Sequence, residues 1–299
     1  MLNFNPLEYP ICLTFPSRVT ASAWTQHVPF GMLLIDALRP RVLVELGSYA
    51  GVSYCGFCQA VKELQTRTQC YAVDTWQGDP QTGFYGDEVL ADLKEHHDPL
   101  YGSFSRLIRS TFEEALTHFE DRSIDLLHID GFHTYEAVKQ DFESWLPKVS
   151  DRGVILFHDT NVRERDFGVW KLWAELKTMY PSFEMLHGHG LGLLAVGKER
   201  PEPLQHLLSL SPADQDCARQ FFYQIGLRIE VAQQSQTLME LTKQQSEKID
   251  TLWRRDSQLQ ELEQLWTVRV HNTWASQGVS GVLRKGIAKI RTNPTPANT

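Results

Sequence analysis

The sequence lacks a long apolar run and an excess of positive charge. No stretch of 18 consecutive apolar residues occurs in its 299 residues, so we expect no membrane-spanning helix. Lys and Arg number 29 against 37 Asp and Glu, the net charge is -8, and the first two hundred residues show no basic face. Proteins that bind nucleic acid usually carry such a face, so nucleic acid is excluded as a main partner.

Cysteine is also scarce. The five Cys residues are an odd number without a regular framework, which indicates a reducing compartment. The first residues lack the basic start and unbroken apolar segment of a signal peptide, so we expect a cytoplasmic protein. Cys55 and Cys58 have redox spacing, but both fall on one face of a predicted helix, where free Cys is commonly buried.

Residues 41–197 alternate short β-branched runs with amphipathic stretches, the pattern of βαβ units and a parallel sheet. Apolar strands such as "VLVEL" are typical of a sheet covered by helices on both faces. We therefore expect an α/β fold, Rossmann-like and doubly wound, over 41–198, preceded by a lead-in and a helix at 1–40. The predicted strands are 41–46, 70–74, 106–110, 125–130 and 153–159, with a closing hairpin at 183–197. The irregular stretch 76–102, with a short polar helix at 88–96, is typical of a lid or substrate loop.

The composition changes after Gly197. We expect a linker at 199–213, a helical extension at 214–275 and a basic flexible tail at 276–299. The tail segment "GVLRKGIAKIR" is amphipathic, and contact with a membrane surface is its alternative role. Apolar residues in the extension recur at a broken three/four spacing, which fits either a coiled coil that joins copies into a homo-oligomer or a helical hairpin packed on its own domain.

Acidic residues and glycines mark the ends of the first two strands. Ligands of an open α/β sheet bind beyond the carboxyl ends of its strands, and in "VELGSYAGVSY" Gly47 and Gly51 allow a tight turn. Tyr49 stands where a G-x-G-x-x-G motif has its middle glycine. Glu45 would repel a pyrophosphate but suits an ammonium and a sulfonium, and Asp74 can accept hydrogen bonds from a ribose. The pair favours S-adenosylmethionine over NAD; the alternative is that either acid caps a helix or ends a solvated strand.

Several motifs, in this order, resemble the class I S-adenosylmethionine-dependent methyltransferases called methyltransferase domain family 24, which include relatives of macrolide-sugar O-methyltransferases and cephalosporin hydroxylase-like proteins. They are "VELGSYAGVSY", "AVDTW", "IDGFHTYEAVKQDF", "GVILFHDT" and "HGHGLGLLAVG". The upstream "WTQHVPFGMLLIDALRP" is similar to the helix before strand one in bacterial members. The resemblance covers about residues 20–198, not the C-terminal third. It implies a seven-stranded sheet with an antiparallel last strand, in agreement with the hairpin.

The resemblance also implies the residues that bind the cofactor. Trp76 can stack on adenine or line the acceptor site, with a loop anchor as the alternative. Thr111 lies where adenine contacts come in this fold, although helix N-capping explains it as well. The whole implied set is Glu45, Gly47, Ser48, Tyr49, Gly51, Asp74, Thr75, Trp76, Thr111 and Asp130.

Two Asp and two His follow the fourth and fifth strands. An O-methyltransferase must orient the acceptor hydroxyl and remove its proton, which a His near its usual pKa of about 6.5 can do. By resemblance, His133 is the candidate general base beside Asp130, and Asp130, His158 and Asp159 are the candidate ligands of Mg²⁺ or Mn²⁺. His158 stands where macrolide-sugar enzymes have Glu, and imidazole is a poorer Mg²⁺ ligand, so a metal-free site in which His158 binds substrate stays open. Alternatively, Asp130 and Asp159 only orient His133 or cap helices.

These observations predict an S-adenosylmethionine-dependent O-methyltransferase that acts on a small-molecule or saccharide acceptor. The resemblance to related enzymes of the family implies that the acceptor is a sugar hydroxyl, in saccharide or natural-product biosynthesis. One alternative is an NAD-dependent oxidoreductase, against which Glu45 and the missing middle glycine argue. The other is a non-catalytic scaffold of a glycan-assembly complex, against which the intact acidic and His positions argue.

Overall fold

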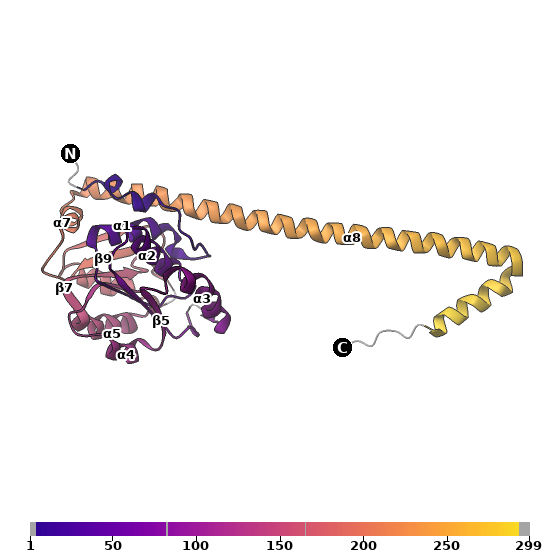
Figure 1. Cartoon of the computed structure of the whole chain (residues 1–299), viewed down its shortest axis with the longest axis horizontal. Coiled ribbons are helices and arrows are strands. Elements are labelled where there is room, and N and C mark those ends of the chain that lie inside the picture. The colour runs from indigo at the N-terminus through magenta and orange to yellow at the C-terminus, as the bar shows by residue number, and fades with distance from the viewer. Residues whose placement is uncertain (1–3, 82, 165, 293–299) are drawn as a thin grey trace. The chain divides into compact units, whose positions relative to one another are not determined.

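The computed structural model describes residues 4–81, 83–164 and 166–292. A seven-stranded sheet lies at the centre of the first compact unit, which ends at Gln234 (Figure 1). β9 runs antiparallel to the other six strands, which are parallel to one another. This confirms the Rossmann-like, doubly wound sheet with an antiparallel last strand. In spatial order the strands are β5 (Ser105–Arg109), β2 (Gln69–Asp74), β1 (Val42–Leu46), β6 (Ile124–Ile129), β7 (Val149–His158), β9 (Leu191–Ala195) and β8 (Ser182–Met185).

The sheet is apolar because helices cover both of its faces. Along β1, Leu43 packs in the core shared with α1 (Val28–Leu38) and α2 (Val52–Glu63), whereas Val44 and Leu46 pack in the core shared with α5 (Tyr135–Trp145) and α6 (Val169–Leu176). Successive side chains of a strand point to opposite faces, so a strand covered twice is apolar throughout. Figure 1 shows α1 and α2 on one face, and α4 (Phe112–Ala115) and α5 on the other.

The helices begin and pack as the sequence predicts. Thr134 caps α5, since its hydroxyl accepts from the Ala137 amide at 3.3 Å. Cys55 and Cys58 are buried in α2, and burial raises the pKa of both thiols well above the usual value. A thiol of raised pKa is a poor nucleophile, which fits the packing role expected for these residues.

The stretch expected as a lid contains a hairpin of β3 (Gly78–Asp79) and β4 (Gly83–Phe84) and then α3 (Asp87–Tyr101). This helix is longer than the expected 88–96 and buries Leu90, Leu93, His97 and Tyr101 at three- and four-residue spacing. His97 Nε2 lies 2.7 Å from the Ser105 hydroxyl on β5, which fixes the C-terminal half of α3 to the sheet.

The C-terminal region is helical. The expected linker contains α7 (Glu202–Leu208), and α8 (Pro212–Thr292) follows. One compact unit ends at Gln234, and a second begins at Ser235. Residues 212–277 form one helix rather than the alternative hairpin, and Gly278 has non-helical backbone angles. The end of the expected tail, 293–299, lies outside the described residues, and no helix within them is long and apolar enough to cross a membrane.

Candidate active site

A cavity of about 780 Å³ lies where β1, β2, β6 and β7 end. These four strands are parallel, so the residues that follow them meet at one edge of the sheet. The hairpin of β3 and β4 contributes a further wall. The predicted site residues that line the cavity are Gly47, Ser48, Tyr49, Gly51, Asp74, Thr75, Thr111, Asp130, His133, His158 and Asp159.

The turn after β1 requires glycine. Gly47 has φ +85, and a Cβ there would lie 2.1 Å from the carbonyl oxygen of Asp130. Gly51 has φ +76 and precedes the first turn of α2. The turn is tight, as predicted, and Gly51, Val52 and Ser53 at the start of α2 line the cavity.

Asp74 organises this turn from the end of β2. Its Oδ2 accepts from the amides of Ser48 at 2.8 Å and Tyr49 at 2.9 Å, and its Oδ1 accepts from the Trp76 amide at 2.7 Å. An ionised carboxylate has about four acceptor sites, so Asp74 can accept from a ligand hydroxyl as well.

Two expected cofactor contacts need correction, because Glu45 and Trp76 lie behind the cavity wall. Glu45 is fully buried, with its carboxylate against the Ser48 hydroxyl and His128. Trp76 is also fully buried and donates from Nε1 to the Tyr49 carbonyl at 3.0 Å, the loop-anchor alternative. Thr111 does line the cavity, but its hydroxyl caps α4 by accepting from the Glu114 amide.

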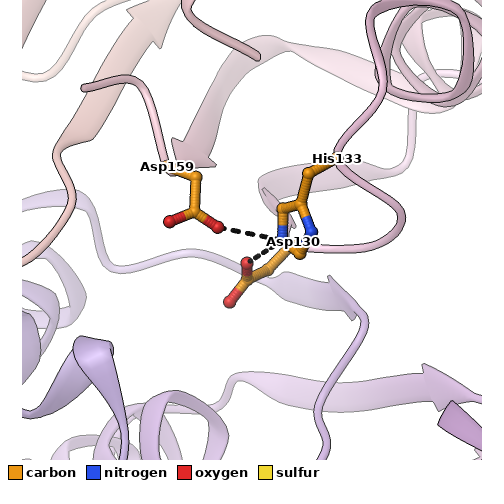
Figure 2. A group of neighbouring side chains, drawn as sticks. All are labelled: Asp130, His133 and Asp159. Carbon is orange, nitrogen blue, oxygen red and sulfur yellow. Dashed lines mark ion pairs between the residues drawn. The ribbon is translucent and has the colours of Figure 1, made fainter. Parts of the chain in front are cut away.

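The two strand-end Asp residues meet His133 (Figure 2). His133 Nε2 lies 2.9 Å from Asp159 Oδ2 and 3.5 Å from Asp130 Oδ1. The imidazole stacks on Phe167, with ring centroids 4.7 Å apart and planes 10° apart. His158 completes the cluster, since its Nδ1 lies 3.3 Å from Asp130 Oδ1 and 3.4 Å from Asp159 Oδ2.

The cluster is a set of buried ion pairs. Burial alone would lower the pKa of His133, but hydrogen bonds to Asp130 and Asp159 outweigh it and raise that pKa to about 9. The pKa of His158 is likewise raised well above its usual value against the effect of burial, and the imidazolium charges hold the pKa of both carboxyls well below theirs. Near neutral pH two imidazolium and two carboxylate groups leave the cluster with no net charge.

Three members of this cluster also fit a divalent cation. Asp130, His133 and Asp159 each offer one ligand atom, and the three atoms lie within 4.8 Å of one another. The predicted set had His158 in place of His133. His158 stays a candidate ligand, because its Nδ1 lies 3.3 and 3.4 Å from the same two carboxylates and its Nε2 faces the Gly188 carbonyl at 3.2 Å, as the outer nitrogen of a metal-bound His usually does. Two carboxylates and an imidazole suit Mn²⁺ better than Mg²⁺.

His189 joins the site without having been predicted. Its Nδ1 lies 3.1 Å from Asp159 Oδ1, and its side chain lines the cavity. Both residues have left-handed backbone, with φ +71 at His189 and +61 at Asp159, a conformation that concentrates at functional sites in non-glycine residues. The sequence "HGHG" signals a tight turn, but nothing in it indicates that the turn reaches Asp159.

Comparisons with known proteins find similarity over the part of the chain that holds this site. A family described as "Methyltransferase domain" matches residues 44–160. A relative from Sinorhizobium fredii, the uncharacterized protein y4gI, is 56% identical over 186 residues, which are 62% of this chain and 20% of the relative. The chain thus spans about a fifth of that relative's length.

Solved structures with a similar chain path are distant in sequence. The SAH-bound methyltransferase PaMTH1 of Podospora anserina is 15% identical, with a TM-score of 0.43 over 56% of this chain and 77% of its own. The O-methyltransferase TomG of Streptomyces achromogenes, solved with SAM, is 12% identical, with a TM-score of 0.44 over 61% and 83%.

The order of the sheet and the position of the cavity define a Rossmann-like α/β domain with its site at the carboxyl strand ends. Residues 44–160 match the methyltransferase domain family, the family that the motifs of this stretch resemble.

The turn after β1 gives a direct test of this geometry. Gly47→Ala should lower the free energy of unfolding by more than about 2 kcal/mol, since it adds a collision with the Asp130 carbonyl to the roughly 1–2 kcal/mol cost of a left-handed backbone. Gly83→Ala is the matched control, because Gly83 has φ +96 but no described atom within 4 Å of a Cβ. Urea denaturation measures both. Equal losses for the two variants would show that Gly47 is not held against Asp130.

Proposed function

We propose that the chain transfers the methyl group of S-adenosylmethionine to a hydroxyl oxygen. One observation carries the proposal: the glycine turn with Asp74 and the His133 cluster line the same cavity. About 780 Å³ is within the usual range of ligand pockets, roughly 300–1,000 Å³. The family match over 44–160 supports the reaction class and argues against the alternatives of an NAD-dependent oxidoreductase and a scaffold.

The donor half of the site is formed by the turn after β1. Amides at the start of α2 and the Asp74 carboxylate can hold the donor, with Asp74 accepting from the ribose hydroxyls. In the transfer the acceptor oxygen bonds to the methyl carbon as the bond from sulfur to that carbon breaks, which leaves S-adenosylhomocysteine. The protein's part is to align the two reactants and to take the hydroxyl proton.

His133 is the group that we assign to that proton. Asp130 and Asp159 hold the ring hydrogen on Nε2, so the proton from the acceptor is received at Nδ1, which has no hydrogen-bond partner among the described residues. The two carboxylates orient the ring and stabilise the imidazolium that forms. The raised pKa of about 9 means that the ring already carries this proton near neutral pH, so it becomes a base only when the proton leaves.

A divalent cation offers a second way to activate the acceptor. Asp130, His133 and Asp159 would hold it, and when bound it lowers the pKa of an acceptor hydroxyl. His133 would then bind the cation through Nε2 and would not act as the base. If one divalent cation replaces the two protons on His133 and His158, the net charge of the cluster is unchanged. The same residues therefore suit both the protonated and the metal-bound cluster.

We propose a sugar hydroxyl as the acceptor, on the basis of the resemblance to macrolide-sugar O-methyltransferases. The cavity mixes aromatic rings with carboxylates, which suits a small polar ring compound that has an apolar face and hydroxyl edges. The aromatic residues concerned are Tyr49, Phe84, Tyr85, Phe112, Phe132 and Phe167.

Donor binding tests the reaction class. Calorimetry should detect binding of S-adenosylmethionine and S-adenosylhomocysteine but not of NAD. Incubation of the protein with S-adenosylmethionine and a panel of monosaccharides and their glycosides should release S-adenosylhomocysteine. Asp74→Ala should weaken donor binding by about tenfold or more, the equivalent of ~1.4 kcal/mol, through loss of the ribose contact and of the turn. Binding of NAD in place of both donor compounds would contradict the proposal.

The pH dependence tests His133. In EDTA the wild-type rate should rise with pH until about 9, because only the deprotonated ring accepts a proton, and His133→Ala should lower the rate about 10²-fold or more while donor binding survives. Added Mn²⁺ should move the rise to lower pH if a cation displaces the proton. The control is His118→Ala, which changes an exposed His outside the cavity. A near-normal rate for His133→Ala would remove its assigned role.

We also propose that the chain forms a homo-oligomer through α8. In the second unit Leu238, Leu252, Leu259 and Trp266 follow a seven-residue repeat, with Gln245 in the same series, and each apolar side chain is more than half exposed. A seven-residue repeat keeps one stripe of a helix against a partner helix, and a lone helix gains little stability in water. With Leu241 and Leu262 beside it, at roughly 100 Å² per residue, the stripe approaches the ~800 Å² per partner of a stable interface.

Light scattering after gel filtration tests this association. The wild-type chain should be a dimer, and Leu252→Glu with Leu259→Glu should make it a monomer because charges enter the stripe. Ser246→Glu with Ser257→Glu adds the same charge on the opposite side of the helix and should leave the dimer intact. A wild-type monomer at micromolar concentration, or dissociation of both variants alike, would contradict the role of the stripe.

A further inference from the structure

Four hydrogen-bonded side chains form a chain at one wall of the cavity. The indole N–H of Trp24 donates to His128 Nε2 at 3.1 Å, and His128 Nδ1 lies 2.8 Å from Glu45 Oε2. The Ser48 hydroxyl donates to the other oxygen of Glu45 at 2.7 Å. Trp24 and Ser48, at the two ends, line the cavity, and the two middle members are completely buried behind them.

The indole fixes the hydrogen positions in this chain. An indole nitrogen can only donate, so His128 Nε2 must accept, and the ring hydrogen of His128 is on Nδ1, where it is donated to Glu45. An imidazole with one N–H is neutral. The carboxylate of Glu45 therefore accepts two hydrogen bonds, and neither of them brings a positive charge.

Another buried carboxylate of the same sheet shows the contrast. Asp125, on β6, receives the guanidinium of Arg41 through two contacts of 2.9 and 3.0 Å, which cancel its charge. Among the described residues no Lys or Arg forms an ion pair with Glu45. A buried anion without a counter-charge is costly, and in such surroundings it attracts a nearby cation more strongly than it would in water.

We propose that Trp24 and His128 are positioning residues that keep Glu45 an uncompensated anion behind the donor site, so that the cationic methyl donor supplies the missing charge. This inference rests on the proposed function, because it places S-adenosylmethionine in this cavity. The sulfonium of the donor is positive, whereas the thioether of S-adenosylhomocysteine is neutral. The site therefore holds the donor in preference to the product, and transfer of the methyl group itself weakens the hold. Trp24 lies in the lead-in, outside the matched residues 44–160.

Calorimetry with both compounds on the full chain tests the proposal through the ratio of their dissociation constants. Glu45→Gln keeps the shape of the side chain but removes the charge. It should weaken the binding of S-adenosylmethionine about tenfold more than the binding of S-adenosylhomocysteine. Trp24→Phe, which keeps an aromatic ring but removes the indole N–H, should shift the ratio in the same direction. His128→Asn retains an N–H beside Glu45 and should preserve more of the preference than His128→Ala.

Trp145→Phe is the matched control. Trp145 is also completely buried, but it packs in the core on the other face of the sheet, and its indole N–H has no hydrogen-bond partner among the described residues. This variant should leave the ratio unchanged. Thermal unfolding of every variant separates loss of fold from loss of preference, and if Glu45→Gln does not fold, Trp24→Phe and the two His128 variants carry the test.

The outcomes separate this inference from the proposed function. A wild-type chain that binds neither compound would overturn the proposed function. A wild-type chain that binds both, with variants that weaken both equally or only lower the melting temperature, would overturn the inference alone and leave a purely structural network. A ratio that responds to Glu45→Gln but not to Trp24 or His128 variants would overturn the roles of those two residues.

Discussion

The close approach of Gly47 to the carbonyl of Asp130 is the constraint on which the candidate site depends. β1 and β6 pair in parallel with Leu46 opposite Ile129, and the Asp130 amide donates to the Leu46 carbonyl at 2.8 Å. The chain leaving β1 must therefore turn directly over the chain leaving β6, and a Cβ in the turn would collide with it. Because the two strand ends are held this close, the glycine turn and the acid–imidazole cluster share one cavity.

The hydrogen-bonding groups behind two imidazoles set opposite charge states within this site. His128 and His158 each face a carboxylate through Nδ1. The Nε2 of His128 accepts from the indole N–H of Trp24, so this ring is neutral. The Nε2 of His158 faces the Gly188 carbonyl, an acceptor, which favours an N–H on both nitrogens of that ring. Glu45 therefore receives no positive charge from His128, whereas Asp130 and Asp159 receive one from His158. The proposed attraction of a cationic donor by Glu45 and the proposed exchange of protons at His133 and His158 thus depend on different hydrogen-bonding groups within one site.

The sequence predicts the sheet well, because a strand covered on both faces must be apolar and because Gly or Asp marks the end of four of these runs. The ends of β1, β2, β6 and β7 locate Gly47, Asp74, Asp130 and Asp159 in one cavity. The sequence does not predict that Glu45 is fully buried, because its partner His128 lies 83 residues further along the chain. It also does not show that His189 reaches Asp159, since the position of a turn between β8 and β9 depends on the packing of the whole hairpin.

Segments outside the matched residues 44–160 complete the site. Trp24 precedes that range and donates to His128 within it. His189 follows the range and contacts Asp159 within it. The strands fix the turn after β1 and the acid pair to the sheet, whereas the lead-in and the turn between β8 and β9 are connecting segments that take no part in the strand pairing. Residues that select ligands concentrate on such connecting segments of a rigid scaffold. The identity of the acceptor should thus depend more on the segments around the cavity than on the strand ends beneath it.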